Sequence, residues 1–296
     1  MVALLVKADT RLEYLDTKIK NKKVYLVVQF LALACEVFRD EIIEALKENC
    51  SPYAIYERSD VEVRKKEGLP LTKGILYGSF DPRVEIIEND IKMIADLENG
   101  QKTGYFLDQK ENRFAIRKYA NSGVVLDCFC NAGGFALNSA LAGAKEVYAL
   151  DISPIATDEV LVNAKLNHLE KTVKPITCDV FNKLREYKEE GKEFDTIILD
   201  PPAFCKSVSE VKDALRGYKD INVLAMKLVK KGGFLISSSC THFVSNQSFE
   251  NMLKECSIMS GRKVKIIETK TQSSDHASLI TSEETTYLKF YVLQIL

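Results

Sequence analysis

Residues 124–135 read VVLDCFCNAGGF, a short apolar run that ends in an aspartate and leads into a loop with two adjacent glycines. A run of this length, bounded by turn-forming residues, is typical of a buried strand. Glycine lets a backbone turn tightly and come close to a ligand. The stretch therefore predicts a strand followed by a ligand-binding loop, as in doubly wound α/β sheets, although the loop alone also fits a plain strand-to-helix turn.

Three more apolar stretches follow in the same style, at residues 146–150, 196–199 and 234–237, with helical patterns between them. Strands and helices that alternate at this spacing indicate a parallel, doubly wound, Rossmann-like sheet. We predict an α/β fold in which this sheet occupies residues 99–296.

The first part of the chain has a different pattern of expected strands and helices. Strands are expected at residues 24–33 and 54–57, a helix at 36–47, and an alternating strand at 84–88. We therefore predict a smaller α+β domain at residues 1–98.

Composition restricts the class of protein. The 296 residues are 46% hydrophobic and 28% charged, with a net charge of -1 that argues weakly against a protein that coats nucleic acid. No apolar run approaches the roughly 18 residues of a membrane span, so we expect a cytoplasmic protein without a membrane partner. The eight cysteines show no zinc-ligand spacing, so no metal is expected.

The strand ends carry acidic residues. Asp151 follows the second strand roughly twenty residues after the glycine loop, where a carboxylate can accept hydrogen bonds from ribose hydroxyls. Asp179, in the sequence Thr177-Cys178-Asp179-Val180, offers a carboxylate that can accept from the exocyclic amine of adenine. The loop lacks the Gly-x-Gly-x-x-Gly pattern that holds a dinucleotide pyrophosphate, so a dehydrogenase is the least favoured enzyme.

The strand expected at 196–199 is followed by Asp-Pro-Pro-Ala-Phe at residues 200–204. This ordered set of strand ends resembles class I methyltransferases, and Asp-Pro-Pro-x-aromatic resembles the subset that acts on nucleobases and other planar or amide nitrogens. The resemblance implies S-adenosylmethionine as cofactor. The residues expected to bind it are Asp127, Phe129, Asn131, Gly133, Gly134, Asp151, Ser153, Asp179, Val180, Asp200 and Pro201.

Several longer patterns lie elsewhere in the chain, at residues 57–60, 64–69, 100–113, 200–204, 216–222, 238–240, 275–276 and 287–289. Together they resemble the ribosomal RNA large-subunit cytosine-5 methyltransferase family, from about residue 20 to the end. The most specific is GQKTGYFLDQKENR at 100–113, which is long, polar and unexplained by periodicity; a tight hairpin is its structural alternative. The resemblance implies an RNA substrate, ribosomal in origin.

Two departures from the family pattern stand out. The chain starts inside what resembles the family's middle domain, so the PUA domain that usually precedes it is expected to be missing and RNA affinity to be lower. Residues 130–134 read CNAGG where the family usually has a Tyr-Thr-Gly-Gly type of sequence, which bears on cofactor affinity.

Cytosine C5 is a poor nucleophile, so such enzymes first add a thiolate to C6. The resemblance assigns this role to Cys240, just past the strand expected at 234–237, although a free cysteine is usually a small buried hydrophobe. Cys205 is the rival because it directly follows residues 200–204. Cys128 and Cys130 are expected to be packing residues.

Substrate contacts are expected around the same loop. Asp200 would accept from the cytosine amine or, if protonated, bond N3. Pro202 stiffens the loop and Phe204 can stack on a flipped base, with core packing as the alternative for Phe204. Lys206 and Arg216 are candidates for phosphate contacts, with solvated surface charge as the alternative.

Two histidines and two other functions stay open. His242 either lowers the thiol pKa of Cys240 or lies on the surface, and His276 fits an ion pair with Asp275. An amino-nitrogen methyltransferase needs the Asp-Pro-Pro motif without a cysteine. A noncatalytic RNA-binding or ribosome-assembly factor is disfavoured, because a decayed site has no reason to keep carboxylates at all four strand ends. A homodimer is left open.

Overall fold

The computed structural model describes residues 10–14, 23–205 and 207–296 of the chain. It divides into two compact units, Met1–Asp108 and Gln109–Leu296, whereas the sequence predicts a boundary at residues 98/99. Each unit has a hydrophobic core of its own. Among the described residues, no helix combines the length and the apolar composition that crossing a membrane requires.

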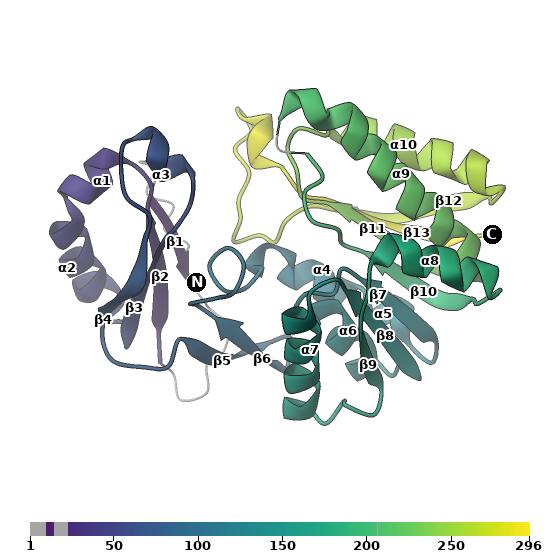
Figure 1. The fold of residues 1–296 in the computed structure, drawn as a ribbon, viewed down its shortest axis with the longest axis horizontal. Helices are drawn as coiled ribbons and strands as arrows, with labels where there is room; N and C mark the ends of the chain where they lie inside the picture. Colours follow the sequence, from purple (N-terminus) through teal and green to yellow (C-terminus); the bar gives the residue numbers. More distant parts are fainter. Residues whose placement is uncertain (1–9, 15–22, 206) are drawn as a thin grey trace. The chain divides into compact units, whose positions relative to one another are not determined.

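The first unit is an α+β structure with a four-stranded sheet in the order β1-β2-β3-β4 (Figure 1). Its strands are β1 Thr10–Tyr14, β2 Tyr25–Phe30, β3 Ala54–Ser59 and β4 Thr72–Tyr77. Its helices are α1 Leu33–Val37, α2 Arg39–Cys50 and α3 Val63–Lys66. Because β2 and β3 are parallel, the chain must cross over between them, and α1 and α2 make that crossing.

A separate hairpin completes this unit. It pairs β5 Arg83–Glu88 with β6 Ile91–Asp96, and both strands alternate buried and less buried side chains. Its turn residues Asn89 and Asp90 have φ angles of 52° and 64°, as a two-residue hairpin turn of the primed type requires. Residues 97–106, which hold much of the GQKTG pattern, form turns after β6 and are not a hairpin of their own.

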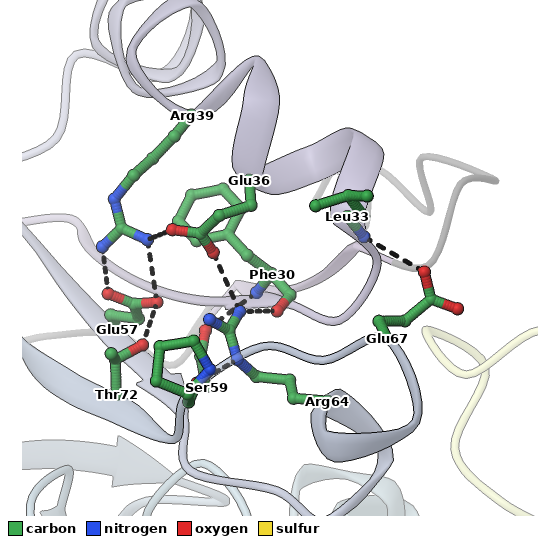
Figure 2. Close-up of polar contacts among 10 residues, drawn as sticks. Phe30, Leu33, Glu36, Arg39, Glu57, Ser59, Arg64, Glu67 and Thr72 are labelled. Atoms are coloured by element: carbon green, nitrogen blue, oxygen red, sulfur yellow. Dashed lines mark hydrogen bonds and ion pairs between the residues drawn. The ribbon is translucent and has the colours of Figure 1, made fainter.

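Arg64 lies fully buried in the first unit and joins three of its elements (Figure 2). Its Nε donates to the carbonyl oxygen of Pro70 (2.8 Å), and its Nη1 donates to Glu36 Oε2 (3.0 Å) and to the carbonyl oxygen of Phe30. The guanidinium therefore donates hydrogen bonds both to a backbone carbonyl oxygen at the end of β2 and to a carboxylate of α1.

A second ion pair extends this network. Arg39 of α2 makes two bonds to the carboxylate of Glu57 on β3, and the Thr72 hydroxyl donates to Glu57 Oε1 (3.0 Å). Patterns 57–60 and 64–69 of the family resemblance thus include residues that hold the first unit together.

The second unit is an α/β structure around a seven-stranded sheet in the order β12-β13-β11-β10-β7-β8-β9. Its strands are β7 Val124–Cys128, β8 Glu146–Asp151, β9 Val173–Thr177, β10 Phe194–Leu199, β11 Val229–Ser239, β12 Val264–Lys270 and β13 Lys289–Ile295. Five strands that are neighbours in the sheet, β11, β10, β7, β8 and β9, run parallel to one another. Strand β13 runs antiparallel to both β11 and β12. The parallel strands agree with the predicted parallel, doubly wound sheet. The antiparallel strand β13 was not predicted.

Helices cover both faces of this sheet, as a parallel sheet requires. The main ones are α4 Lys110–Ala115, α5 Arg117–Ala120, α6 Gly134–Leu141, α7 Pro154–Leu166, α8 Val180–Glu189, α9 Val211–Leu228 and α10 Asn246–Ser260. Short 3-10 turns lie at Leu107–Gln109, Val208–Glu210 and Glu283–Thr285. Helices α8, α9 and α10 lie side by side on one face (Figure 1).

The order in which strands are added to the sheet reverses at β7: strands β8 and β9 lie on one side of it, and β10 and β11 lie on the other. In open parallel sheets such a reversal leaves a crevice beyond the carboxyl ends of the strands, and ligands bind there. The ends of β7, β8, β10 and β11 are therefore the place to look for a site.

Candidate active site

The loop after β7 has a strained backbone held by hydrogen bonds. Phe129, Asn131 and Gly133 have φ angles of 64°, 48° and 85°. Such angles are unfavourable for residues other than glycine, so the surrounding contacts must enforce them. The Asn163 side chain of α7 donates to the carbonyl oxygen of Ala132 (3.0 Å).

Both glycines of the loop are needed for space. A Cβ added at Gly133 would lie 3.1 Å from the methyl groups of Val160. One added at Gly134 would lie 2.5 Å from Cδ of Arg113, whose side chain is buried beside the start of α6. The glycine loop is thus packed from two sides and keeps a defined shape.

Asp151, at the end of β8, ties this loop to the next one. Its Oδ2 accepts from the Asn131 backbone N–H (3.0 Å), and its Oδ1 accepts from the Ser153 backbone N–H (3.0 Å). The Ser153 hydroxyl in turn caps α7 by accepting from the Ala156 N–H (3.3 Å). The predicted residues Asn131, Asp151 and Ser153 are therefore brought together.

Asp179 lies at the end of β9 and is exposed. It is the N-cap of α8, where its Oδ1 accepts from the Asn182 N–H (2.9 Å). The next residue, Val180, is buried in the core. Capping gives Asp179 a structural role besides the contact with adenine that the sequence predicts.

Asp127 is fully buried at the end of β7. Burial raises its pKa well above the usual range, and the nearby charges of Asp200 and Asp151 raise it further. Neither carboxylate oxygen accepts a hydrogen bond of ordinary geometry from the described residues. Burial and these neighbouring charges therefore favour the neutral, protonated form of Asp127.

Asp200 follows β10 and receives two donors on one oxygen. Gln109 Nε2 donates to Asp200 Oδ1 (2.9 Å), and the Ser238 hydroxyl at the end of β11 donates to the same atom. Pro201 is buried and Pro202 is exposed. The carboxylate is therefore fixed in orientation at the edge of the sheet.

Phe204 packs in an aromatic cluster. Its ring centroid lies 4.7 Å from that of Tyr218, 6.0 Å from that of Phe181 and 6.4 Å from that of Phe129. The side chain is only partly buried. Most contacts of Phe204 are therefore those of a core-packing residue. Only the exposed part of its ring is available to a base.

Cys240 lies directly beyond β11, half-buried, with its Sγ 3.9 Å from the carbonyl oxygen of Pro201. Of its rivals, Cys205 is buried and its thiol donates to the carbonyl oxygen of Ser207 (2.9 Å). Burial raises the pKa of the Cys128 and Cys130 thiols well above the usual range. Buried thiols of this kind are poor nucleophiles.

Two basic residues of α9 are engaged with acids. Arg216 is exposed and pairs with Asp213, one turn earlier on α9. Lys219 pairs with Glu255. Lys206 lies outside the described residues.

His242 and His276 lie in different surroundings, and each matches one of the alternatives that the sequence left open. His242 is exposed and its ring lies against Phe243, with centroids 3.9 Å apart. His276 pairs with Asp275 (3.1 Å), as predicted, and Asp275 also pairs with Lys110 (2.6 Å). No cluster of three or more His, Cys, Asp or Glu side chains suited to a metal ion occurs within residues 10–14, 23–205 and 207–296.

Two residues at this edge escaped the sequence analysis as individual candidates. Gln109 contacts Asp200, and its only signal was its place in the polar pattern at 100–113. Lys289 is buried beside the end of β11, where it pairs in register with Ser239 and donates to the carbonyl oxygens of Thr241 and Val244. Its only signal in the sequence was its place in the pattern at 287–289.

The side chains at this edge fit an adenosyl sulfonium group better than a dinucleotide. Carboxylates end β7, β8 and β10, and a fourth caps the helix after β9. Such acceptors suit hydroxyl and amine donors and a positive charge, whereas a pyrophosphate requires donors.

Comparisons with known proteins agree with this assignment. Residues 86–243 match the family model of the TRM5/TYW2 methyltransferase domain. Ribosomal RNA large subunit methyltransferase I of Escherichia coli O139:H28 is 39% identical over 274 residues, which covers 92% of this chain and 69% of that protein. The same enzyme of Salmonella enteritidis PT4 is 40% identical over 275 residues, which covers 92% and 68%.

Solved structures show the same fold. SMU.776 complexed with SAH aligns with a TM-score of 0.78 at 22% identity, over 91% of this chain and 69% of that one. The complex of aTrm5 and tRNALeu aligns with a TM-score of 0.66 at 20% identity, over 96% and 72%. The predicted α/β, Rossmann-like methyltransferase fold is confirmed.

The fold and the residues at its carboxyl edge define an S-adenosylmethionine-dependent methyltransferase. The predicted enzyme class and cofactor are thereby confirmed, and the noncatalytic and dehydrogenase alternatives are set aside. The chain belongs to the ribosomal RNA large subunit methyltransferase I family of RNA methyltransferases.

Proposed function

We propose that this methyltransferase forms 5-methylcytosine in large-subunit ribosomal RNA through a covalent adduct of Cys240. The names of the relatives support the RNA class. The observation that carries the chemistry is the 3.9 Å approach of Cys240 Sγ to the Pro201 carbonyl oxygen. This contact puts the thiol next to the turn that begins with Asp200, so one base can meet both groups.

The other cysteines near this edge suit the reaction less well. Cys128, Cys130 and Cys205 are buried, whereas Cys240 is half-buried. Cys178, after β9, is half-buried too, but burial raises its pKa, and three strands (β10, β7 and β8) separate β9 from β11 in the sheet order. Among the cysteines that the structure describes, Cys240 alone combines partial exposure with a position beside the turn that begins at Asp200.

The proposed reaction begins at the Cys240 sulfur and ends with its release. The Cys240 thiolate adds to C6 of cytosine, and the C5–C6 π electrons move onto the ring, which makes C5 nucleophilic. S-adenosylmethionine supplies a methyl group on a positively charged sulfur that departs as a neutral thioether. C5 takes this methyl group, and a base then removes the C5 proton. The electron pair of the C5–H bond restores the double bond as the Cys240 sulfur leaves C6 with its bonding pair.

Asp200 and the cofactor residues act by positioning. Asp200 accepts from the cytosine amine and orients the ring. Asp151 accepts from the cofactor's ribose hydroxyls, and the glycine loop with Asp127, Phe129, Asn131, Gly133 and Gly134 shapes the neighbouring wall. Ser153, Asp179, Val180 and Pro201 complete the cofactor side of the proposed site.

Substrate RNA would meet the exposed rim of the same loop. Pro202 and the exposed part of Phe204 offer an apolar surface for a flipped base, and Arg216 would exchange its pairing with Asp213 for a phosphate. A ribosomal substrate agrees with the cytoplasmic location expected from the sequence.

The test is methyl transfer from labelled S-adenosylmethionine into a large-subunit ribosomal RNA transcript, with the modified nucleoside identified by mass spectrometry. Cys240→Ala should abolish label in 5-methylcytosine, a loss of at least about 1,000-fold, because removal of a nucleophile removes the covalent route. Cys205→Ala is the matched control and should keep most of the rate.

Label in an N-methylated base that survives Cys240→Ala would establish the amino-nitrogen alternative and overturn the covalent proposal. Loss of 5-methylcytosine in Cys205→Ala with retention in Cys240→Ala would move the nucleophile to Cys205.

A further inference from the structure

Residues 109–113 belong to the polar pattern that periodicity does not explain, and their side chains reach several parts of the second unit. Lys110 pairs with Asp275, and Glu111 Oε1 accepts from the Ser274 N–H (3.0 Å). Gln109 and Asn112 are almost completely buried. A segment with so many defined partners acts as a polar scaffold for the edge of the sheet.

The orientation of the Gln109 amide is determined by its neighbours. Asn112 Nδ2 donates to Gln109 Oε1 (2.7 Å) and also to the carbonyl oxygen of Thr271 (3.0 Å). Because the Gln109 oxygen already accepts from an N–H, the other end of the amide must be the donor. Gln109 therefore presents Nε2 to Asp200 Oδ1 at 2.9 Å.

Asp200 Oδ1 receives a second donor from the Ser238 hydroxyl. Two donors on one oxygen stabilise the ionised carboxylate and stop it from rotating. We infer that Gln109 is a positioning residue that keeps Asp200 an ionised, oriented hydrogen-bond acceptor for the exocyclic amine of the target base.

This inference rests on the proposed function, in which Asp200 faces the target base. An ionised carboxylate accepts and cannot donate, so it fits the amine of cytosine and repels the O4 oxygen of uracil. Gln109 would thereby contribute to the choice of cytosine without touching the base.

Other ionisable groups lie around Asp200. Asp127 faces it from β7, Tyr218 from α9, and Cys240 follows β11. Burial raises the pKa of Asp127 well above its usual range, and burial also raises that of Tyr218. Burial thus favours the neutral form of both groups, whereas Gln109 and Ser238 both donate to Asp200 Oδ1.

Gln109→Glu tests the inference through pH. The new side chain keeps its size and can accept from Asn112, but as a carboxylate it repels Asp200. When the pair holds one shared proton, the new group can donate to Asp200 again. The ratio of variant to wild-type rate should therefore rise at least about 10-fold as the pH falls from about 8 to about 6.

Gln109→Met tests the same contact without a new charge. Its kcat on a large-subunit ribosomal RNA transcript should fall roughly 10- to 100-fold, because Asp200 loses a donor that orients it and favours its ionised form. Gln272→Met is the matched control: Gln272 is a buried glutamine of the same unit whose amide reaches Ser278 and Thr285 instead.

The outcomes separate the two proposals. If wild type makes no 5-methylcytosine, the proposed function fails whatever the variants do. If wild type does, and Gln109→Glu keeps a pH-independent ratio while circular dichroism shows it folded, the positioning role is wrong. A folded Gln109→Met with wild-type kcat would overturn it as well.

Discussion

Asp151 is a residue on which two loops depend. Its two oxygens hold the backbone N–H groups of Asn131 and Ser153, so the carboxylate orders both loops before any ligand arrives. The same carboxylate is proposed to accept from the cofactor's ribose. Its removal should therefore affect cofactor binding through contact and through loop order together.

Asp151→Asn should weaken S-adenosylmethionine binding by about 10- to 100-fold, or about 1.4–2.7 kcal/mol, measured by isothermal titration calorimetry. An amide keeps the size but replaces one acceptor with a donor that faces an N–H. Asp195→Asn is the control, because Asp195 lies at the opposite end of β10 and pairs with Lys230. Equal affinities for the two variants would contradict the assignment.

Single residues differ in how far the sequence predicts them. Asp151 and Asp200 were predictable because each directly follows an apolar strand. The bond from Gln109 to Asp200 joins residues 91 positions apart, so no local pattern can reveal it. Whether Phe204 packs or stacks also depends on rings from other elements.

Strand β13 carries Lys289 as its first residue, 2% exposed. Its ammonium donates to three carbonyl oxygens, those of Thr241, Val244 and Tyr287. Burial lowers the pKa of Lys289 to about 8, and the charge of a Cys240 thiolate opposes this shift. The lysine thus joins β13 to the loop that follows Cys240.

Lys289 should make stability depend on pH in a defined direction. Its folded-state pKa of about 8 lies below the ordinary value of 10.5, so between these limits the unfolded chain binds more protons. Stability therefore rises with pH across this window. The denaturation midpoint of wild type relative to Lys289→Met should increase from about pH 8 to about pH 10. A pH-independent difference would show that Lys289 does not titrate there.

The last strands show where element prediction stops. Strands β7, β8 and β10 were found because they are buried on both faces and read as apolar runs. Strand β12 is mostly exposed, with charges among its apolar residues. Strand β13 inserts antiparallel between β12 and β11, and such a pairing depends on contacts across the sheet.

At the scale of the whole chain, the two units have separate cores and different kinds of polar residues. The first is held by buried ion pairs around Arg64 and Glu57, and the second carries the carboxylates and Cys240. The network of Figure 2 therefore bears on stability and not on the proposed chemistry.

Arg64→Met should destabilise the first unit by about 2–5 kcal/mol, because it leaves the carbonyl oxygens of Phe30 and Pro70 without their donor and removes one of the two arginines that pair with Glu36. Hydrogen exchange at β2 and β3 would measure the loss. Lys65→Met, which breaks an exposed pair with Glu62, should cost no more than about 0.5 kcal/mol. Similar losses for both variants would contradict a structural role for Arg64.

The covalent role of Cys240 is tested most directly by trapping its adduct. A large-subunit ribosomal RNA transcript made with 5-fluorocytidine should hold the enzyme, because fluorine at C5 cannot leave as a proton and the sulfur–C6 bond then persists. With S-adenosylmethionine present, we expect a denaturant-stable protein–RNA species whose cross-linked peptide contains Cys240. A species linked through Cys205, or none from a preparation that makes 5-methylcytosine, would contradict the account.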